Sequence, residues 1–182
     1  MSGERVVTQL KDMGKDEVIL LGAIGLAAEG IQLLARAAVP RDGLDSVLKA
    51  KVRIRFSCAG SILFFQGLEQ IIQLAFKRCG MDQPKCKQHE ILPLFDLLSN
   101  ETALSIALKN QGLRLMTARK VVESAEHNFM AARYFGQRGK YNFSSVKAKY
   151  AKQCAVAIVA CHFPNLLNEF VFQIEYENRV QF

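Results

Sequence analysis

The sequence predicts an all-α protein, an antiparallel helical bundle of five to seven helices. Apolar residues recur at the spacing of a helix face, and no stretch shows the alternation of a half-buried strand. Glycine, proline and capping residues divide the chain into helix-length segments with short connections. With 182 residues, we expect one domain over residues 1–182, with a core over about 15–165 and a C-terminal helix and tail over about 165–182.

The first two predicted helices are the longest. The first covers about residues 16–38 and ends before Pro40. The second begins after Asp45, a favourable N-cap residue, and runs to about residue 79, where Gly80 can end it.

Two glycines, Gly60 and Gly67, lie inside the second predicted helix. A glycine within a helix costs about 1 kcal/mol relative to alanine, so it usually has a packing reason. We therefore expect another helix to approach closely at both positions.

The rest of the chain predicts shorter helices. One is expected to open at His89 after a polar loop, and Ser99–Glu101 can cap the next. The segment GQRGKYN, residues 136–142, marks a turn, and Pro164 separates the last two helices. These predicted helices cover about residues 89–98, 102–111 and 113–135, then a helix capped by Asn142 or Ser144 that reaches about residue 162, and a last helix over about 165–176.

The chain is basic, with a formal net charge of +7 and a sequence pI of about 9.3. Such a charge favours polyanionic partners such as RNA, DNA or an anionic membrane surface. An ordinary basic protein is the equal alternative, because the basic residues are scattered. The sequence lacks a phosphate-binding glycine loop, a serine nucleophile elbow and a paired-histidine metalloprotease helix, which argues against those enzyme classes.

The five cysteines, an odd number, predict reduced thiols and a cytoplasmic protein. The first residues are too charged for a signal peptide. Two apolar stretches, 18–39 and 56–76, are interrupted by charged and amide side chains, including Glu29, Arg36 and Glu69. We therefore expect core helices of a soluble bundle and no membrane span.

A polar stripe on the second long helix is the first candidate site. Glu69, Gln73 and Lys77 follow one another at four-residue spacing among apolar neighbours. The stripe is either the solvent face of an amphipathic helix or a buried polar row paired with Arg or His from another helix. His89 is either an anchor for its loop or a group that contacts a carboxylate or phosphate.

Cysteine and histidine, two residue types that bind metals, occur close together in one segment, but their spacing is not that of a known zinc motif. Cys79, Cys86 and His89 form C-x6-C-x2-H, whereas structural zinc sites usually have four ligands in tighter pairs. No CxxC occurs, and the later thiols and His162 add no recognisable partner motif. We expect no metal and no cofactor.

Arg119 and His127 lie about two turns apart on one predicted helix, with Glu123 four residues from each. The simpler interpretation is a surface row of ion pairs. The alternative is catalytic: an imidazole and a cation could assist RNA cleavage by activating a hydroxyl and stabilising developing charge.

Arg133, Tyr134, Arg138 and Lys140 interleave cations with an aromatic ring around the predicted turn. This combination suits a surface that contacts phosphates and stacks on bases. The downstream segment 147–152 adds three lysines and Tyr150. We expect this region to be the best candidate for a nucleic-acid surface, with an ordinary solvated helix end as the alternative.

Two segments, GLEQIIQLAFK (67–77) and QHEILPLFDLL (88–98), together resemble the HEPN domains (higher eukaryotes and prokaryotes nucleotide-binding). In those all-helical domains a helix with a central glutamate and trailing lysine precedes a histidine–acidic–leucine helix. Residues 128–141 look like the Arg-Tyr segment of some members. The matching positions are Glu69, Lys77, His89 and Glu90.

The resemblance implies a bundle that often dimerises and often belongs to toxin–antitoxin or phage-defence systems, with an antitoxin-like protein as one partner. Many members are metal-independent ribonucleases marked by an arginine and a later histidine with four to six residues between them. Here seven residues separate Arg119 from His127, which departs from that pattern. We therefore expect a non-catalytic module that binds RNA, another nucleic acid, a nucleotide or a protein partner. The alternatives are a degenerate ribonuclease and an assembly protein without a ligand.

Overall fold

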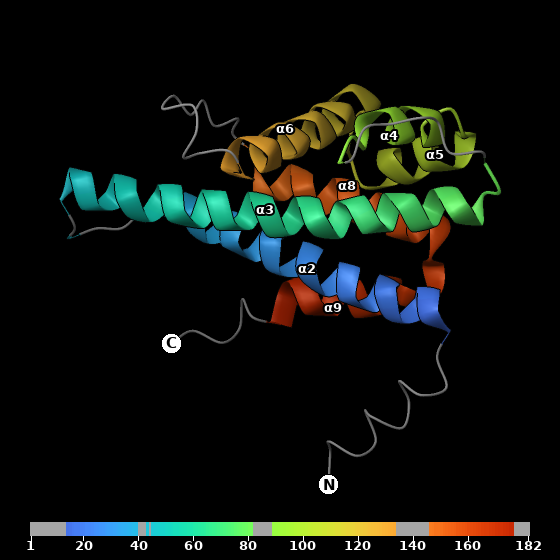
Figure 1. Ribbon diagram of the computed structural model, residues 1–182, viewed down its shortest axis with the longest axis horizontal. Coiled ribbons are helices and arrows are strands. Elements are labelled where there is room, and N and C mark those ends of the chain that lie inside the picture. Colours follow the sequence, from blue (N-terminus) through green and yellow to red (C-terminus); the bar gives the residue numbers. More distant parts are fainter. Residues whose placement is uncertain (1–13, 40–42, 44, 82–88, 134–145, 177–182) are drawn as a thin grey trace, which may run out of the picture.

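The computed structural model describes residues 14–39, 43, 45–81, 89–133 and 146–176. Over these residues the chain forms seven α-helices and one short 3₁₀ turn, with no strand (Figure 1). The predicted all-α class is confirmed. The elements are α2 (Lys15–Ala38), α3 (Ser46–Arg78), α4 (Leu92–Leu98), α5 (Thr102–Asn110), α6 (Leu115–Arg133), α8 (Ala148–His162), η1 (Pro164–Leu166) and α9 (Leu167–Tyr176).

The expectation that His89 opens a helix is wrong. α4 begins at Leu92, with Ile91 as its N-cap residue and a proline in its first turn. His89 has φ of 70°, in the left-handed region, so it cannot form the first turn of a right-handed helix. The chain therefore turns at His89 and enters α4 three residues later.

Glycines bring α2 and α3 into backbone contact. A Cβ atom on Gly30 would collide with the backbone nitrogen of Phe64, and one on Gly67 would collide with the backbone of Ala27. A Cβ on Gly60 would lie 2.9 Å from the carbonyl oxygen of Gly30. The prediction that Gly60 and Gly67 mark a close helix approach is confirmed.

The long α2–α3 pair crosses the molecule; α4, α6, α8 and α9 pack on it, and α5 packs on α8 (Figure 1). The helices α4, α5 and α6 lie on one side of α3, whereas α9 packs against α2. The central helix is α8, which contacts α2, α3, α5, α6 and α9. Its residues 154–159 are all buried and pack in the same core as Phe64 and Phe65 of α3.

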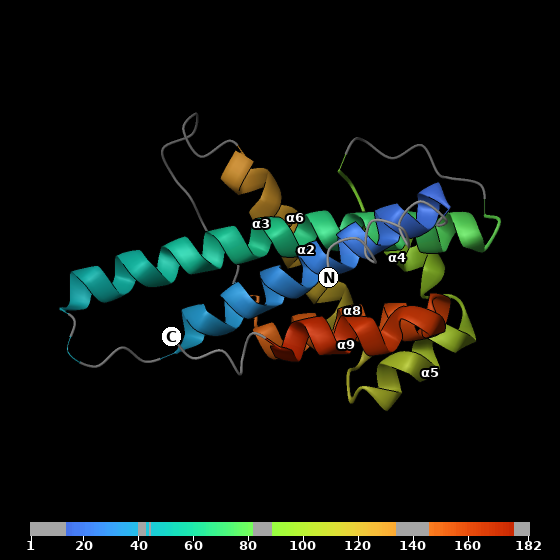
Figure 2. The same ribbon diagram turned by 90° about the horizontal axis from the view of Figure 1, so that it is seen from below.

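The first turns of α3 extend beyond the end of α2 and stand clear of the other helices (Figures 1 and 2). We call this segment, residues 46–55, the α3 overhang. All of its residues are exposed except Val52, which is partly buried. Asp45 caps the helix by accepting a hydrogen bond from the backbone N–H of Leu48 at 2.8 Å. The overhang is thus an isolated helical segment of about 15 Å.

Among the described helices, α2 is the one long and apolar enough to cross a membrane by length and composition. Half of its most apolar window is buried within the bundle. Core helices of soluble proteins show the same properties. The expectation that the chain has no membrane span therefore stays a prediction.

Candidate functional site

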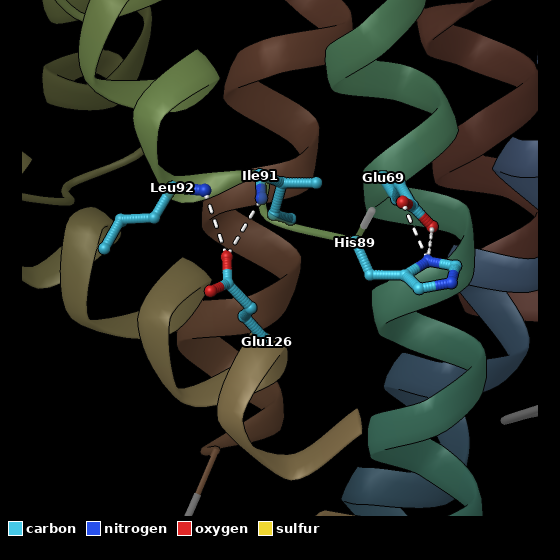
Figure 3. A network of polar contacts seen from close by, with 5 residues as sticks. All are labelled: Glu69, His89, Ile91, Leu92 and Glu126. Atoms are coloured by element: carbon cyan, nitrogen blue, oxygen red, sulfur yellow. Dashed lines mark hydrogen bonds and ion pairs between the residues drawn. The ribbon is translucent and has the colours of Figure 1, made fainter. Parts of the chain in front are cut away.

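Glu69 and His89 form a largely buried pair between α3 and the segment before α4 (Figure 3). The Nδ1 atom of His89 lies 3.1 Å and 3.3 Å from the two carboxylate oxygens of Glu69. The side chains are 20% and 10% exposed, respectively. The polar stripe is therefore no uniform solvent face: Glu69 is buried and paired with a histidine, while Lys77 is exposed.

An aromatic ring packs against the histidine, and a second ring stacks on the first. The ring of Phe129 lies 5.1 Å from the ring of His89 in a tilted arrangement, and Phe65 stacks on Phe129 at 4.4 Å. The imidazole is thus held by Glu69 of α3 and by Phe129 of α6. We infer that His89 anchors the entry to α4 and does so through its contact with the Glu69 carboxylate, so the two roles suggested by the sequence coincide.

Glu126 of α6 caps α4 from outside the helix (Figure 3). Its Oε2 atom accepts hydrogen bonds from the backbone N–H groups of Ile91 at 2.9 Å and Leu92 at 3.1 Å. Those N–H groups have no partner within a helix, and a negative charge is favourable at a helix N-terminus. α4 therefore depends on a side chain from another helix for its N-terminal cap.

Substituting Glu126 with alanine should lower the free energy of unfolding by about 1–2 kcal/mol, because two N–H groups at the start of α4 lose their acceptor. The E126Q variant keeps an acceptor oxygen and should lose less. Urea unfolding followed by circular dichroism measures the difference. Glu123→Ala, at an exposed position one turn away, is the control and should change stability by less than about 0.5 kcal/mol. Equal losses in E126A and E123A would contradict the capping role.

Arg119, one of the two catalytic candidates, is engaged by α4. Its Nε and Nη2 atoms donate to the two carboxylate oxygens of Asp96 at 2.9 Å and 3.0 Å. This hydrogen-bonded pair, together with the charge of Asp96, raises the pKa of Arg119. Arg119 thus pairs with Asp96 and not with Glu123, as the predicted row of ion pairs would have it. The charge of Glu123 makes only a smaller contribution to the raised pKa of Arg119.

His127, the other catalytic candidate, is exposed on α6. Eight residues of helix place it about 12 Å along the axis from Arg119. Arg119 and Glu126 of the same helix both bind α4. The described contacts of α6 therefore fasten one helix to another, and they do not bring the two catalytic candidates together.

Lys77, a predicted ligand residue, forms an ion pair with Asp16 of α2. Both side chains line a pocket of about 460 Å³ at the ends of α2 and α3. In the same pocket the guanidinium of Arg78 lies 5.7 Å from the ring centre of Phe163. Lys77 is therefore neutralised by a neighbour and does not share a contact with Glu69 or His89 in the described structure.

The predicted basic and aromatic surface lies largely outside the described residues. Tyr134, Arg138 and Lys140 belong to residues 134–145, which the structure does not describe, and Arg133 is described only as the last residue of α6. Downstream, the ammonium of Lys147 lies 5.8 Å from the ring of Tyr150. Lys152 pairs with Glu175 of α9 at 3.0 Å. Part of the predicted extension is thus used in contacts within the bundle.

The α3 overhang carries a basic surface that the sequence interpretation missed. Its four cations, Lys49, Lys51, Arg53 and Arg55, are exposed. None of them pairs with an acidic side chain in the described part of the chain. The signal in the sequence is KAKVRIR, residues 49–55, in which cations alternate with small or apolar residues and no acid intervenes.

A second group that the sequence did not reveal joins Cys79, Glu101 and His162. Each potential metal-ligand atom lies within 4.8 Å of the others. Burial and a hydrogen bond to Glu101 raise the pKa of Cys79 to about 11. Burial, with a smaller effect of Arg78, lowers the pKa of His162 against an opposing effect of Glu101. The three residues are widely separated in the sequence, so no spacing motif could have indicated the group.

No known family model, curated protein or solved structure matches this chain significantly. The assignment of a function therefore depends on the chain's own residues and their geometry. Among the described surfaces, the α3 overhang offers the largest exposed concentration of unpaired positive charge.

Proposed function

We propose that this chain is a non-catalytic helical module that binds nucleic acid through the α3 overhang. The observation that carries the proposal is four exposed cations within seven residues on a helical segment that stands clear of the bundle. Contacts between such side chains and phosphates supply most non-specific nucleic-acid affinity. The net charge of +7 acts in the same direction at longer range.

The helical register places these cations on two sides of the overhang. Lys49 and Arg53 are four residues apart and share one side, and Lys51 and Arg55 share a nearly opposite side. The small and apolar positions Ala50 and Ile54 lie between the two pairs. The major groove of B-form DNA admits an α-helix and has phosphates along both edges. This arrangement favours duplex DNA, bound with little sequence preference because polar base-reading side chains are few.

The contacts of the catalytic candidates support a module without catalysis. Arg119 is bound by Asp96, and His127 lies about 12 Å farther along α6. Arg119 therefore contributes to packing of α4, whereas charge-stabilising chemistry would require it to face a substrate beside the imidazole of His127.

The HEPN resemblance is part of the proposal. The contact between Glu69 and His89 supports it, because these residues occupy two of the four matching positions and meet across two elements. With it we propose the biological setting that the resemblance implies, a toxin–antitoxin or phage-defence system.

Salt-dependent binding tests the proposal. Fluorescence anisotropy with a short labelled duplex DNA should give an affinity that falls about a hundredfold between about 50 and 200 mM salt, as expected for four phosphate contacts. A matched RNA duplex should bind more weakly, because the A-form major groove does not admit a helix. An affinity independent of salt, or binding only to anionic lipid vesicles, would contradict the proposal.

The non-catalytic part is tested on the same samples. Labelled RNA incubated with the protein in chelator should stay intact on a denaturing gel. Cleavage that disappears in His127→Ala would establish the ribonuclease instead, whereas cleavage that persists in His127→Ala identifies a contaminant.

A further inference from the structure

Three helix ends meet at a group of potential metal ligands. Cys79 directly follows α3, Glu101 directly precedes α5, and His162 is the last residue of α8. One atom from each lies within 4.8 Å of the other two. The group therefore joins parts of the chain that are far apart in the sequence, as ligands of a metal site commonly are.

The spacing of the thiol and imidazole fits a tetrahedral metal site. The Sγ atom of Cys79 lies 3.7 Å from Nδ1 of His162. Zinc is bound by sulfur at about 2.3 Å and by nitrogen at about 2.0–2.1 Å, so the two ligand atoms of a tetrahedral site lie about 3.6 Å apart. An ion could thus bind between these atoms with little movement of either side chain.

The histidine is buried and presents one ring nitrogen to the thiol. His162 is 6% exposed, and its Nδ1 atom is the one that faces Sγ of Cys79. Nδ1 is therefore the atom that would bind an ion at this group. Cys79 and Glu101 are only partly buried, so an ion or a water molecule can reach the group from that side.

The chemistry of the group favours a metal over a nucleophilic cysteine. A catalytic cysteine requires a lowered pKa, which cationic neighbours provide. Here the neighbour of Cys79 is the carboxylate of Glu101, and a negative charge beside a thiol does not activate it as a nucleophile. A bound divalent cation would displace the thiol proton and use the thiolate, the imidazole and the carboxylate as ligands.

We propose that Cys79, Glu101 and His162 bind one zinc ion, with the fourth position open to water or to the neighbouring thiol of Cys161. A thiolate and an imidazole are ligands that zinc prefers, whereas magnesium and calcium require mainly oxygen ligands. The ion would fasten the ends of α3 and α8 to the start of α5.

The test uses the full chain after treatment with chelator. Titration with Co²⁺ should give one ion per chain, visible d–d bands of a four-coordinate site and a thiolate-to-cobalt charge-transfer band, all removed by Zn²⁺. Cys79→Ser should weaken Co²⁺ binding by more than about a hundredfold, beyond the loss usual for an outer-shell partner. Cys58→Ser removes a different thiol, on α3, and this variant should bind Co²⁺ as tightly as the unmodified chain does.

A thermal-shift measurement provides a readout independent of the spectrum. Zn²⁺ should raise the melting temperature of the unmodified chain and of C58S, but not that of C79S. Because Cys79 is partly exposed and serine is nearly isosteric, C79S is expected to fold, which circular dichroism checks. A folded chain that gives no charge-transfer band, or the same band in C79S, would overturn the proposal.

Discussion

Replacing the four cations of the α3 overhang by glutamine is expected to lower the affinity for duplex DNA about a thousandfold at about 0.1 M salt. Each phosphate contact contributes a slope of about −0.9 to log K against log salt, so loss of four contacts reduces the slope by about 3.6. Glutamine has a good helix propensity, so the helix should persist. Anisotropy titrations at several salt concentrations measure both the affinity and the slope.

A second quadruple variant controls for net charge. Lys15, Lys109, Arg114 and Lys120 are also exposed, and their replacement by glutamine removes four charges from other parts of the chain. This control should retain most of the affinity and nearly the full salt slope, since it weakens only long-range attraction. If both variants lose affinity equally, general charge rather than the overhang is responsible and the proposed surface is wrong.

Substituting Gly67 with alanine should lower the free energy of unfolding by about 3 kcal/mol. The new Cβ would collide with the backbone of Ala27, which cannot move aside as a flexible side chain can. Overpacking of this kind costs about 1–3 kcal/mol or more, and the collision with backbone places this site at the upper end. Alanine gains about 1 kcal/mol of helix propensity, which is included in that value. Urea unfolding followed by circular dichroism gives the measurement.

The matched control is Gly22→Ala on α2. Gly22 is exposed, and nothing lies within 4 Å of the position that its Cβ would take. The variant therefore gains helix propensity without a collision and should be more stable by up to about 1 kcal/mol. If G22A raises the free energy of unfolding and G67A lowers it, close packing, and not glycine flexibility, explains why residue 67 is a glycine. A neutral or stabilising G67A would contradict the observed helix approach.

The helices were predictable because their signals are local. Apolar periodicity, the cap at Asp45 and the glycine after α3 determine where the long helices lie. The start of α4 was not predictable. It depends on the backbone conformation of His89 and on a cap from Glu126, which lies 35 residues beyond Ile91 on another helix. Such a distant cap leaves no pattern near the residues that it stabilises.

The candidate sites were only partly predictable. The sequence indicated a partner for a buried Glu69, and the structure supplies His89. The basic overhang was present in the sequence, but its exposure depends on where α2 ends relative to α3. The group around Cys79 depends on three helix ends that meet only in the folded chain.

The difference in length between α2 and α3 divides α3 energetically. From Gly60 onward, the helix is stabilised by buried apolar surface that other helices share. Its first ten residues have no such support and include two β-branched valines and an isoleucine, which are weaker helix formers. Isolated helices of that length are only marginally stable in water. The cap at Asp45 and the continuity of the overhang with the buried part of α3 therefore supply much of its helix stability. A ligand that fixes this segment must therefore spend part of its binding free energy on ordering it, and affinity becomes coupled to helix stability.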